Sequence, residues 1–270
     1  MSTTQSSRWA LVTGASAGIG AAFARELGSR GSSLVLTARR EDRLTALAAE
    51  LLQRYHTRVE CIAADLADPQ APEKLCAEIE RRGIAIDTLI NNAGYGLPGS
   101  FVSQPWDKHA EFIQVMMTAP CELARLLLPP MQARGFGRIV NVASLAGLVP
   151  GSAGHTLYGA SKAFLIKFSQ SLALENLRHG VNVCALCPGF TYSEFHDITG
   201  TRGVVSKMPN WMWLSADEVA RRGMDAVERG EIVCVTGRVN RAIKTLFKLL
   251  PDRFALRMMQ KRSKNFRAQD

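Results

Sequence analysis

The stretch WALVTGASAGIG, residues 9–20, decides the fold of this chain. Its first five residues are apolar or β-branched and predict a buried strand, and a helical stretch begins at Ala21. The glycines at 14, 18 and 20 lie between the two, where they let the backbone approach a pyrophosphate at the positive end of the helix. The spacing G-x-x-x-G-x-G differs from the common G-x-G-x-x-G, so a purely structural turn stays an alternative.

Strand and helix patterns alternate along the rest of the chain. We expect further strands at 33–37, 58–63, 87–90, 138–143, 181–186 and 231–236. We expect helices at 21–29, 41–55, 72–82, 106–131, 154–179 and 215–229. This alternation predicts an α/β fold, a Rossmann-like doubly wound parallel sheet of about seven strands with helices on both faces. We expect one domain over 1–270, with a core at about 8–237 and a C-terminal helical extension at about 238–267.

The composition is that of an ordinary globular protein of 270 residues, 47% of them hydrophobic. Residues 1–8 are polar, and no window approaches the ~20 apolar residues of a membrane-spanning helix. We therefore expect a cytoplasmic protein. Six cysteines are scattered along the chain, and Cys184 and Cys187 fall on opposite faces of an expected strand. We expect buried free thiols and no metal site.

The net charge of +9 comes almost entirely from the C-terminal segment. Residues 238–270 hold ten Lys or Arg and two Asp, which leaves residues 1–237 nearly neutral. Apolar and basic stripes at helical spacing predict two short helices there, separated at Pro251. A helix pair packed on the body with solvated cations is one interpretation, and peripheral contact with a membrane is the other. Nucleic acid is not expected as a partner, because the body carries no recognition motif.

The second expected strand ends at Ala38-Arg39-Arg40. Many NAD sites place an acidic residue at this point to bond the ribose 2′-hydroxyl. A guanidinium instead suits a 2′-phosphate through paired, charge-assisted hydrogen bonds. Solvated cations at a helix N-terminus are the alternative, but they oppose the helix dipole. The two arginines therefore favour NADP over NAD.

Tyr158 and Lys162 stand four residues apart and share one face of an expected helix. A neighbouring ammonium favours the phenolate, so we expect the pKa of Tyr158 to be lowered from its usual value near 10. Such a phenol gives a proton to a carbonyl oxygen, or takes one from an alcohol, near neutral pH. An exposed helix face is the alternative interpretation of this pair.

Five motifs occur in a fixed order along the chain. They are Thr13-Gly14-x-x-x-Gly18-x-Gly20, Asn91-Asn92-Ala93-Gly94, Ser144, Tyr158-x-x-x-Lys162 and Pro188-Gly189. Over residues 8 to 237 the chain thus resembles the short-chain dehydrogenase/reductase family, of the type that prefers NADP. The resemblance implies that Tyr158 is the general acid/base, that Lys162 lowers its pKa and bonds the nicotinamide ribose, and that Ser144 donates to the substrate oxygen.

The resemblance also implies a set of residues that contact the cofactor, NADP. These are Gly14, Ser16, Gly18, Ile19, Gly20, Arg39, Arg40, Asp65, Leu66, Asn92, Ala93, Gly94, Tyr158, Lys162, Pro188, Gly189, Thr191 and Ser193. The chain departs from the family at Met116, where an asparagine usually helps hold a water that links the lysine to solvent. A thioether cannot supply the hydrogen bonds of an amide, so proton delivery depends on a backbone carbonyl or on Gln114.

The segment between Phe190 and Leu214 caps the substrate in the family, and here it is rich in aromatic residues and Met. This content favours a small apolar substrate, such as a fatty-acyl, steroid-like or other lipophilic carbonyl, although packing or a subunit contact would explain it as well. His155 and His196 are candidates for this pocket or ordinary structural histidines. The resemblance further implies a homodimer or homotetramer. A non-catalytic NADP-binding or scaffolding protein of the same fold is the competing function.

Overall fold

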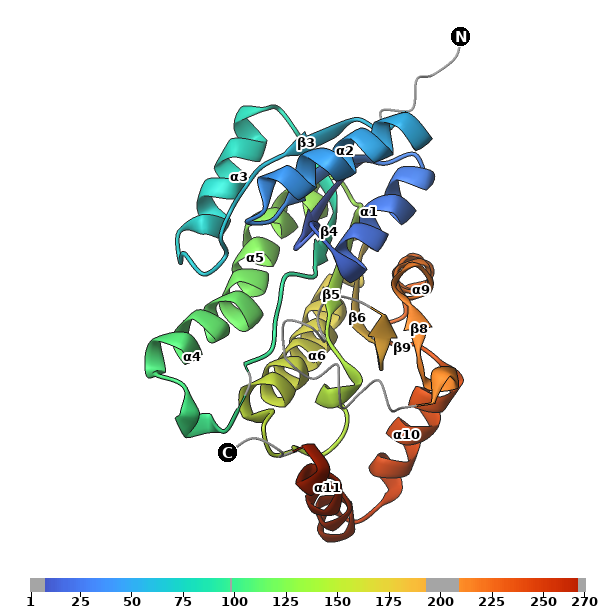
Figure 1. Ribbon diagram of the computed structural model, residues 1–270. Coiled ribbons are helices and arrows are strands. Elements are labelled where there is room, and N and C mark those ends of the chain that lie inside the picture. Colours follow the sequence, from blue (N-terminus) through green and yellow to red (C-terminus); the bar gives the residue numbers. More distant parts are fainter. Residues whose placement is uncertain (1–7, 98, 193–208, 267–270) are drawn as a thin grey trace.

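A computed structural model describes residues 8–97, 99–192 and 209–266, and seven parallel strands form its main sheet (Figure 1). The strands are β1 (Trp9–Thr13), β2 (Ser33–Thr37), β3 (Val59–Cys61), β4 (Ile86–Asn91), β5 (Gly137–Val142), β6 (Val181–Cys187) and β9 (Val233–Val235). Their order is β3-β2-β1-β4-β5-β6-β9. The strand order reverses between β1 and β4, which confirms the doubly wound sheet. In such sheets ligands bind at the carboxyl ends of the strands beside this reversal.

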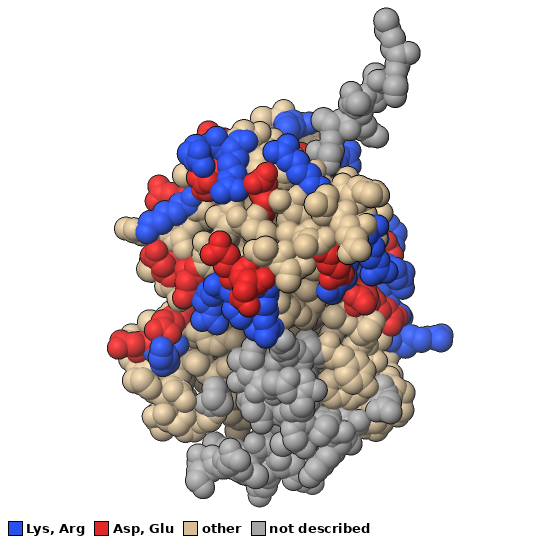
Figure 2. Space-filling view, turned by 45° about the horizontal axis from the view of Figure 1, so that its top comes forward, with Lys and Arg blue, Asp and Glu red and all other residues tan. Residues whose placement is uncertain are grey.

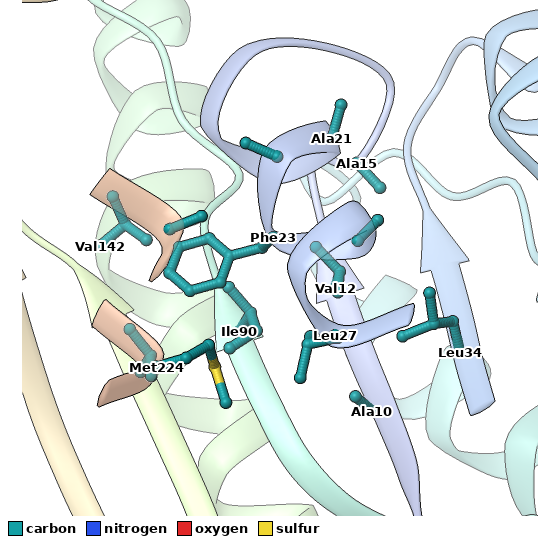
Figure 3. Packing of buried hydrophobic residues seen from close by; sticks show 14 of the residues in the cluster. Ala10, Val12, Ala15, Ala21, Phe23, Leu27, Leu34, Ile90, Val142 and Met224 are labelled. Carbon is teal, nitrogen blue, oxygen red and sulfur yellow. The ribbon is translucent and has the colours of Figure 1, made fainter. Parts of the chain in front are cut away.

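Helices cover both faces of the sheet because the strands are apolar on both sides. One face carries α1 (Gly18–Ser29), α2 (Glu41–Tyr55) and α9 (Ala216–Glu228). The other carries α3 (Ala71–Arg81), α5 (Ala119–Ala133) and α6 (Thr156–Asn176). Phe23 of α1 is fully buried between Ile90, Val142 and Met224, so the packing of α1 joins the sheet to α9 (Figure 3).

The prediction of one continuous helix over 106–131 is wrong in one respect. Helix α4 (Trp106–Ile113) and α5 are separated by a π-helical turn, Gln114–Thr118. The N–H of Ala119 donates to the carbonyl of Gln114, five residues earlier. Pro120 has no N–H to continue the α-helical ladder, so the backbone at Met116 lacks its usual partner four residues on. Such π-turns occur often at functional sites.

The remaining elements lie near the carboxyl ends of the strands and at the C-terminus (Figure 1). They are η1 (Phe101–Ser103), η3 (Leu145–Gly147), β7 (Thr191–Tyr192), η4 (Asn210–Met212), β8 (Leu214–Ser215), α10 (Arg238–Leu249) and α11 (Asp252–Phe266). Ser215 caps α9, because its hydroxyl accepts the N–H of Glu218 at 3.1 Å. Strands β3 and β9 are each three residues long where six were expected, and apart from the divided helix at 106–131 the other predicted elements differ by a few residues at their ends.

All six cysteines are free, and Cys184, Cys187 and Cys234 are buried. Cys184 and Cys187 are buried on β6, and burial raises the pKa of Cys187 to about 12. Within the described ranges, no group of three His, Cys, Asp or Glu is placed to hold a metal ion. Over the same ranges, no helix has the length and apolar content needed to cross a bilayer.

Candidate active site

The glycine-rich turn after β1 packs against the end of β4 more closely than any side chain would allow. A Cβ on Gly14, which has φ +63°, would lie 2.8 Å from the Cα of Ala93, and one on Gly20 would collide with the carbonyl of Gly14. Asn92 fastens the turn, since its Nδ2 donates to the carbonyls of Thr13 at 2.9 Å and Gly14 at 3.2 Å. The motifs around Gly14 and Asn92 therefore form one unit.

The buried side chain of Thr13 also stabilises this unit. Its hydroxyl donates to the carbonyl of Ile90 and accepts the N–H groups of Asn92 and Ala93 at 2.9 and 3.0 Å. The Nδ2 group of Asn92 is thus occupied by the carbonyls of the turn. Only the backbone and the outer edge of the turn remain to contact a ligand.

The N-terminus of α1 is open to an anion. Ala17 at the N-cap position has an extended backbone and no polar side chain. The N–H groups of the first turn therefore have no side-chain cap. Gly18, Ile19 and Gly20 form that turn, and it contains no acidic residue. These features fit a diphosphate, which the helix dipole and the free N–H groups would both favour.

The two arginines after β2 are placed differently. Arg40 donates from Nε and Nη2 to the hydroxyl of Ser16, at 3.2 and 2.9 Å, so it reaches back to the glycine-rich turn. Arg39 is exposed and lies close enough to lower the pKa of Tyr95, which burial raises overall. Asp65 acts on the same phenol in the opposite sense. Tyr95 is therefore near both charges, a neighbourhood that its position after the Asn-Asn-Ala-Gly motif did not reveal.

Asp65 and Leu66 follow β3 and have distinct surroundings. Asp65 is exposed, and its Oδ1 accepts the N–H of Ala67 at 3.1 Å. Leu66 is buried in a small apolar cluster with Val115 and Ala119. A ligand at the carboxyl ends of the strands would thus meet the carboxylate of Asp65 and only the backbone of Leu66.

The structure brings Ser144, Tyr158 and Lys162 together. The hydroxyls of Ser144 and Tyr158 form a hydrogen bond, and Ser144 Oγ also accepts the N–H of Ala146 at 3.1 Å. Lys162 is buried, and its Nζ donates to the carbonyl of Val142 at 2.7 Å and lies 5.7 Å from the centroid of the Tyr158 ring. A Cβ on Gly147 would lie 2.6 Å from the backbone of Lys162, so η3 and α6 pack backbone to backbone.

The expected lowering of the pKa of Tyr158 is wrong for this structure. Burial raises the pKa of the phenol, and the hydrogen bond with Ser144 offsets only part of that increase. Burial also lowers the pKa of Lys162 to about 8, since it disfavours the ammonium. The ammonium bonds a carbonyl of β5 in place of the phenol, and the sequence alone does not reveal that burial outweighs the pairing.

Comparisons with known proteins agree with this geometry. Residues 8–201 match the family model for short chain dehydrogenases. The chain is 33% identical to a short-chain dehydrogenase from Sphingobium yanoikuyae solved in complex with NADPH, over 90% of this chain and 96% of that one, with a TM-score of 0.78. This chain belongs to the short-chain dehydrogenase family.

Two further members are similar to this short-chain dehydrogenase. A bulky-bulky ketone specific alcohol dehydrogenase from Comamonas testosteroni is 30% identical, covers 90% of this chain and 95% of its own, and has a TM-score of 0.75. A very-long-chain 3-oxoacyl-CoA reductase from Anas platyrhynchos is 35% identical over 71% of this chain. The match spans 62% of the length of the duck protein.

In this short-chain dehydrogenase, Met116 fills the position of the family asparagine. Its side chain is 1% exposed, and its Sδ would lie 2.8 Å from a Cβ placed on Gly94. The thioether therefore packs on the Asn-Asn-Ala-Gly loop. Gln114 stands two residues before Met116 in the chain. Its Nε2 is buried and has no hydrogen-bond partner among the described residues.

The loop after β6 packs against α10, a contact that the sequence did not predict. The carbonyl of Pro188 accepts the N–H of Leu145 at 2.8 Å, and Thr191 donates to the carbonyl of Gly189 at 3.2 Å. Asn240 of α10 is 3% exposed, and a Cβ on Gly189 would lie 2.6 Å from its Cγ. Sequence reasoning missed Asn240 because it stands alone in the basic tail. Ser193 lies outside the described residues.

Asn240 also ties α10 to the last strand. Its Nδ2 donates to the carbonyl of Thr236 at 2.7 Å, and Gly237 between them has φ +85°. A Cβ on Gly237 would lie 3.2 Å from Asn240 Nδ2. One amide thus joins the end of β9, the start of α10 and the Pro188-Gly189 loop.

A shallow recess, open to solvent, adjoins Tyr158. Its lining includes Leu97, Phe101, His109, Phe112, His155 and Tyr158. His109 stacks on Phe101 with ring centroids 4.7 Å apart, and its Nε2 bonds the carbonyl of Phe101 at 2.8 Å. Burial lowers the pKa of His155, which keeps this histidine neutral near pH 7. His196, the other candidate, lies outside the described residues.

Proposed function

We propose that this chain is an NADP-dependent oxidoreductase that interconverts a lipophilic ketone and its secondary alcohol. The observation that carries the proposal is the hydrogen bond between Ser144 and Tyr158, at the edge of a recess and beside a buried Lys162. This arrangement offers two hydroxyls to one carbonyl oxygen, which is the requirement for protonating that oxygen as charge develops on it.

The roles of the three residues follow from their surroundings. Tyr158 gives its proton to the carbonyl oxygen in reduction, and takes one from the alcohol in oxidation. Ser144 donates a hydrogen bond to the same oxygen while its own Oγ is held by the N–H of Ala146. NADPH, when bound, supplies the hydride. Lys162, which bonds the Val142 carbonyl in this structure, would hold the nicotinamide ribose of a bound cofactor, and its positive charge would lower the pKa of Tyr158.

The residues at the carboxyl ends of the strands suit NADP. The open N-terminus of α1 would hold the diphosphate, with Gly14, Ser16, Gly18, Ile19 and Gly20 around it. Arg39 and Arg40 would bind the 2′-phosphate, Arg40 from its position on Ser16. Asp65, Leu66, Asn92, Ala93 and Gly94 would border the adenosine and ribose, and Pro188, Gly189, Thr191 and Ser193 the nicotinamide. The family member solved with NADPH supports this choice.

Proton supply cannot use the side chain of the family asparagine, because Met116 stands at that position. We infer that the backbone carbonyl of Met116 holds the relay water, because Pro120 removes the N–H that would otherwise occupy this carbonyl in an α-helix. The π-helical turn opens the ladder at the same place. Gln114 Nε2, buried without a partner among the described residues, is the second candidate.

The substrate class is inferred from the recess and from the relatives. The lining combines apolar side chains such as Phe101 and Phe112 with polar ones such as Gln104 and Thr156, and the aromatic rings favour a carbonyl compound with an apolar part. The similar proteins named above act on bulky ketones and very-long-chain 3-oxoacyl-CoA by their names. A fatty-acyl, steroid-like or other lipophilic ketone therefore agrees with both.

The assembly we propose is a single-domain subunit that forms a homodimer or homotetramer through its long helices. The outer side of α6 supports this, because Leu174 and Leu177 are 62% and 69% exposed there. Phe164 on the same helix is also partly exposed and stacks on Phe168. Large apolar side chains on one helix mark a surface suited to a partner.

The competing function is a non-catalytic NADP-binding protein, which the Met116 substitution and the raised pKa of Tyr158 favour. A panel of lipophilic ketones with NADPH separates the two functions. We expect the native protein to oxidise NADPH with some of these ketones and Tyr158→Phe to show no such activity. NADPH binding with no turnover on any ketone or alcohol would favour the non-catalytic function.

A further inference from the structure

Helices α10 and α11 expose an unusual combination of side chains. Leu246 and Leu249 on α10 are 48% and 78% exposed, and Phe254, Leu256 and Met258 on α11 are 44%, 55% and 39% exposed. We call residues 238–260 the C-terminal hairpin. These five large apolar side chains are exposed to solvent, although many others of their kind in the described residues are buried, which marks a surface suited to contact with an apolar partner.

The cations of the hairpin stand beside these apolar residues. Arg241, Lys248, Arg253 and Arg257 are exposed, and none of them forms an ion pair with a described carboxylate. Asp252 is the sole acidic residue between 238 and 260. The hairpin is therefore basic and apolar at once, without internal neutralisation.

Many cations of the body, residues 8–237, form ion pairs with acidic side chains. Arg25 pairs with Glu50 at 2.7 Å, and Arg82 pairs with both Glu78 and Glu60. Figure 2 shows basic and acidic side chains interleaved over the body. The net positive charge is thus concentrated in the hairpin, which holds six Lys or Arg and one Asp, whereas residues 1–237 are nearly neutral in total.

The hairpin is anchored to the body at two points. Asn240 holds the start of α10 against Gly189 and the carbonyl of Thr236. Ala255 of α11 is 2% exposed, so α11 also packs on other residues. Figure 1 shows both helices at the end of the molecule where the strands terminate and α6 begins, which is the end that carries Tyr158.

We propose that the C-terminal hairpin binds the surface of an anionic lipid bilayer. Its leucines and phenylalanine would enter the boundary between headgroups and acyl chains, while its cations meet the anionic headgroups. A second copy of this chain is a poor partner for the same face, because two surfaces of equal positive charge repel. Nucleic acid would use the cations but leave the large apolar side chains without a role.

Docking in this orientation would present the open recess beside Tyr158 near the bilayer, where lipophilic ketones accumulate. The binding itself requires no turnover. A failure of the binding experiment below would therefore leave the proposed oxidoreductase activity unaffected, and an inactive protein could still bind vesicles.

Flotation of the full-length protein with vesicles tests the proposal. One set of vesicles contains phosphatidylcholine alone, and the other contains phosphatidylcholine and phosphatidylglycerol in comparable amounts. We expect binding to the anionic vesicles and little binding to the neutral ones. Arg241→Gln with Lys248→Gln should weaken binding about fivefold for each charge removed. Leu246→Gln with Leu249→Gln should weaken it about tenfold or more for each leucine.

The matched control is Leu52→Gln with Arg54→Gln on α2, a leucine and an arginine that are also exposed but lie at the other end of the molecule. This variant should bind like the native protein. Equal loss in the control, or no loss in the leucine variant, would overturn the proposal. A smaller native mass by sedimentation in the leucine variant, with vesicle binding unchanged, would instead assign the face to a subunit contact.

Discussion

The two ends of the proposed cofactor site differ in how their polar groups are held. Near the nicotinamide end, Ser144 accepts the N–H of Ala146 and bonds Tyr158, and buried Lys162 bonds the Val142 carbonyl. At the adenosine end, Arg39 and Asp65 are exposed. Groups already held by the protein have their geometry set before a ligand arrives, whereas exposed groups lose freedom only on binding. Substitutions at the first end should therefore reduce the rate, and those at the second end the cofactor affinity.

The largest effect is expected for Tyr158→Phe. Without the phenolic hydroxyl, ketone reduction should fall to less than about a hundredth of the native rate, since general acid catalysis contributes at least this much. The dissociation constant for NADPH should stay nearly unchanged, because the cofactor is held mainly elsewhere. Initial rates and fluorescence titration measure the two quantities, with Tyr55→Phe on α2 as the control. A variant that keeps more than that fraction of the rate would remove Tyr158 from its role.

Lys162→Met should also abolish turnover, but it should make the folded protein more stable. Burial lowers the pKa of Lys162 from 10.5 to about 8, so the folded state disfavours the ammonium at pH 7. This loss of stability is fully present below about pH 8, and it disappears as the pH rises toward 10.5, the pKa of the lysine in the unfolded chain. We expect the variant without cofactor to be more stable than the native protein by up to about 3 kcal/mol at pH 7.

The difference between the two proteins should narrow between pH 8 and 10.5. Comparing the pair at each pH removes the contribution of the buried cysteines, whose raised pKa values destabilise both proteins in alkali. Denaturant unfolding across this range measures the effect. A native protein that is the more stable of the two at pH 7 would show that Lys162 is held as a favourable charge.

At the adenosine end we expect a strong preference for NADPH over NADH. Loss of a bidentate, charge-assisted phosphate contact costs about 1.5–3 kcal/mol, so Arg39→Ala should reduce the preference about 10- to 150-fold. Arg40→Ala should reduce it too, and should also free Ser16. The ratio of kcat/KM values for the two cofactors reports both changes. Equal affinities in the native protein, or an Arg39→Ala variant with its preference intact, would contradict this assignment.

Asn240 connects the nicotinamide end to the C-terminal hairpin. Asn240→Leu keeps the branching and number of side-chain heavy atoms but loses the bond to the Thr236 carbonyl, a change that costs about 1–3 kcal/mol of stability. We expect a decrease in kcat/KM of about tenfold, while 2′,5′-ADP, which lacks the nicotinamide, binds as before. Thr245→Ala on the exposed side of the same helix is the control. An equal loss of 2′,5′-ADP binding would indicate general destabilisation.

The smallest effect on turnover is expected for Met116→Asn. If the Met116 carbonyl or Gln114 already serves the proton relay, the restored amide should add nothing and should destabilise the fold, since an unsatisfied buried polar group costs about 1–3 kcal/mol. Turnover and the solvent isotope effect of the variant and the native protein measure this. A several-fold increase in turnover with a smaller isotope effect would show that the missing asparagine limits the enzyme.

The sequence predicted the sheet and the grouping of most site residues because every motif except the Tyr158/Lys162 pair lies at the end of a buried strand. Parallel strands bring such ends together, as Gly14 and Asn92 show. The π-turn at 114–118 was missed because helical periodicity continues through it, and Pro120 alone indicated a break. Asn240 was missed because only the fold brings it onto Gly189. The pKa of Tyr158 was misjudged because burial depends on packing and not on the four-residue spacing.

The central claim is that this chain transfers hydride between NADP and a carbonyl compound with Tyr158 as the acid. The most direct test uses NADPH that carries deuterium at both positions of its reactive nicotinamide carbon, with a lipophilic ketone that the native protein reduces. Mass spectrometry should find one deuterium on the carbinol carbon of the alcohol with native protein, and none above background with Tyr158→Phe. Tight NADPH binding with no deuterium transfer to any ketone in the panel would contradict the claim.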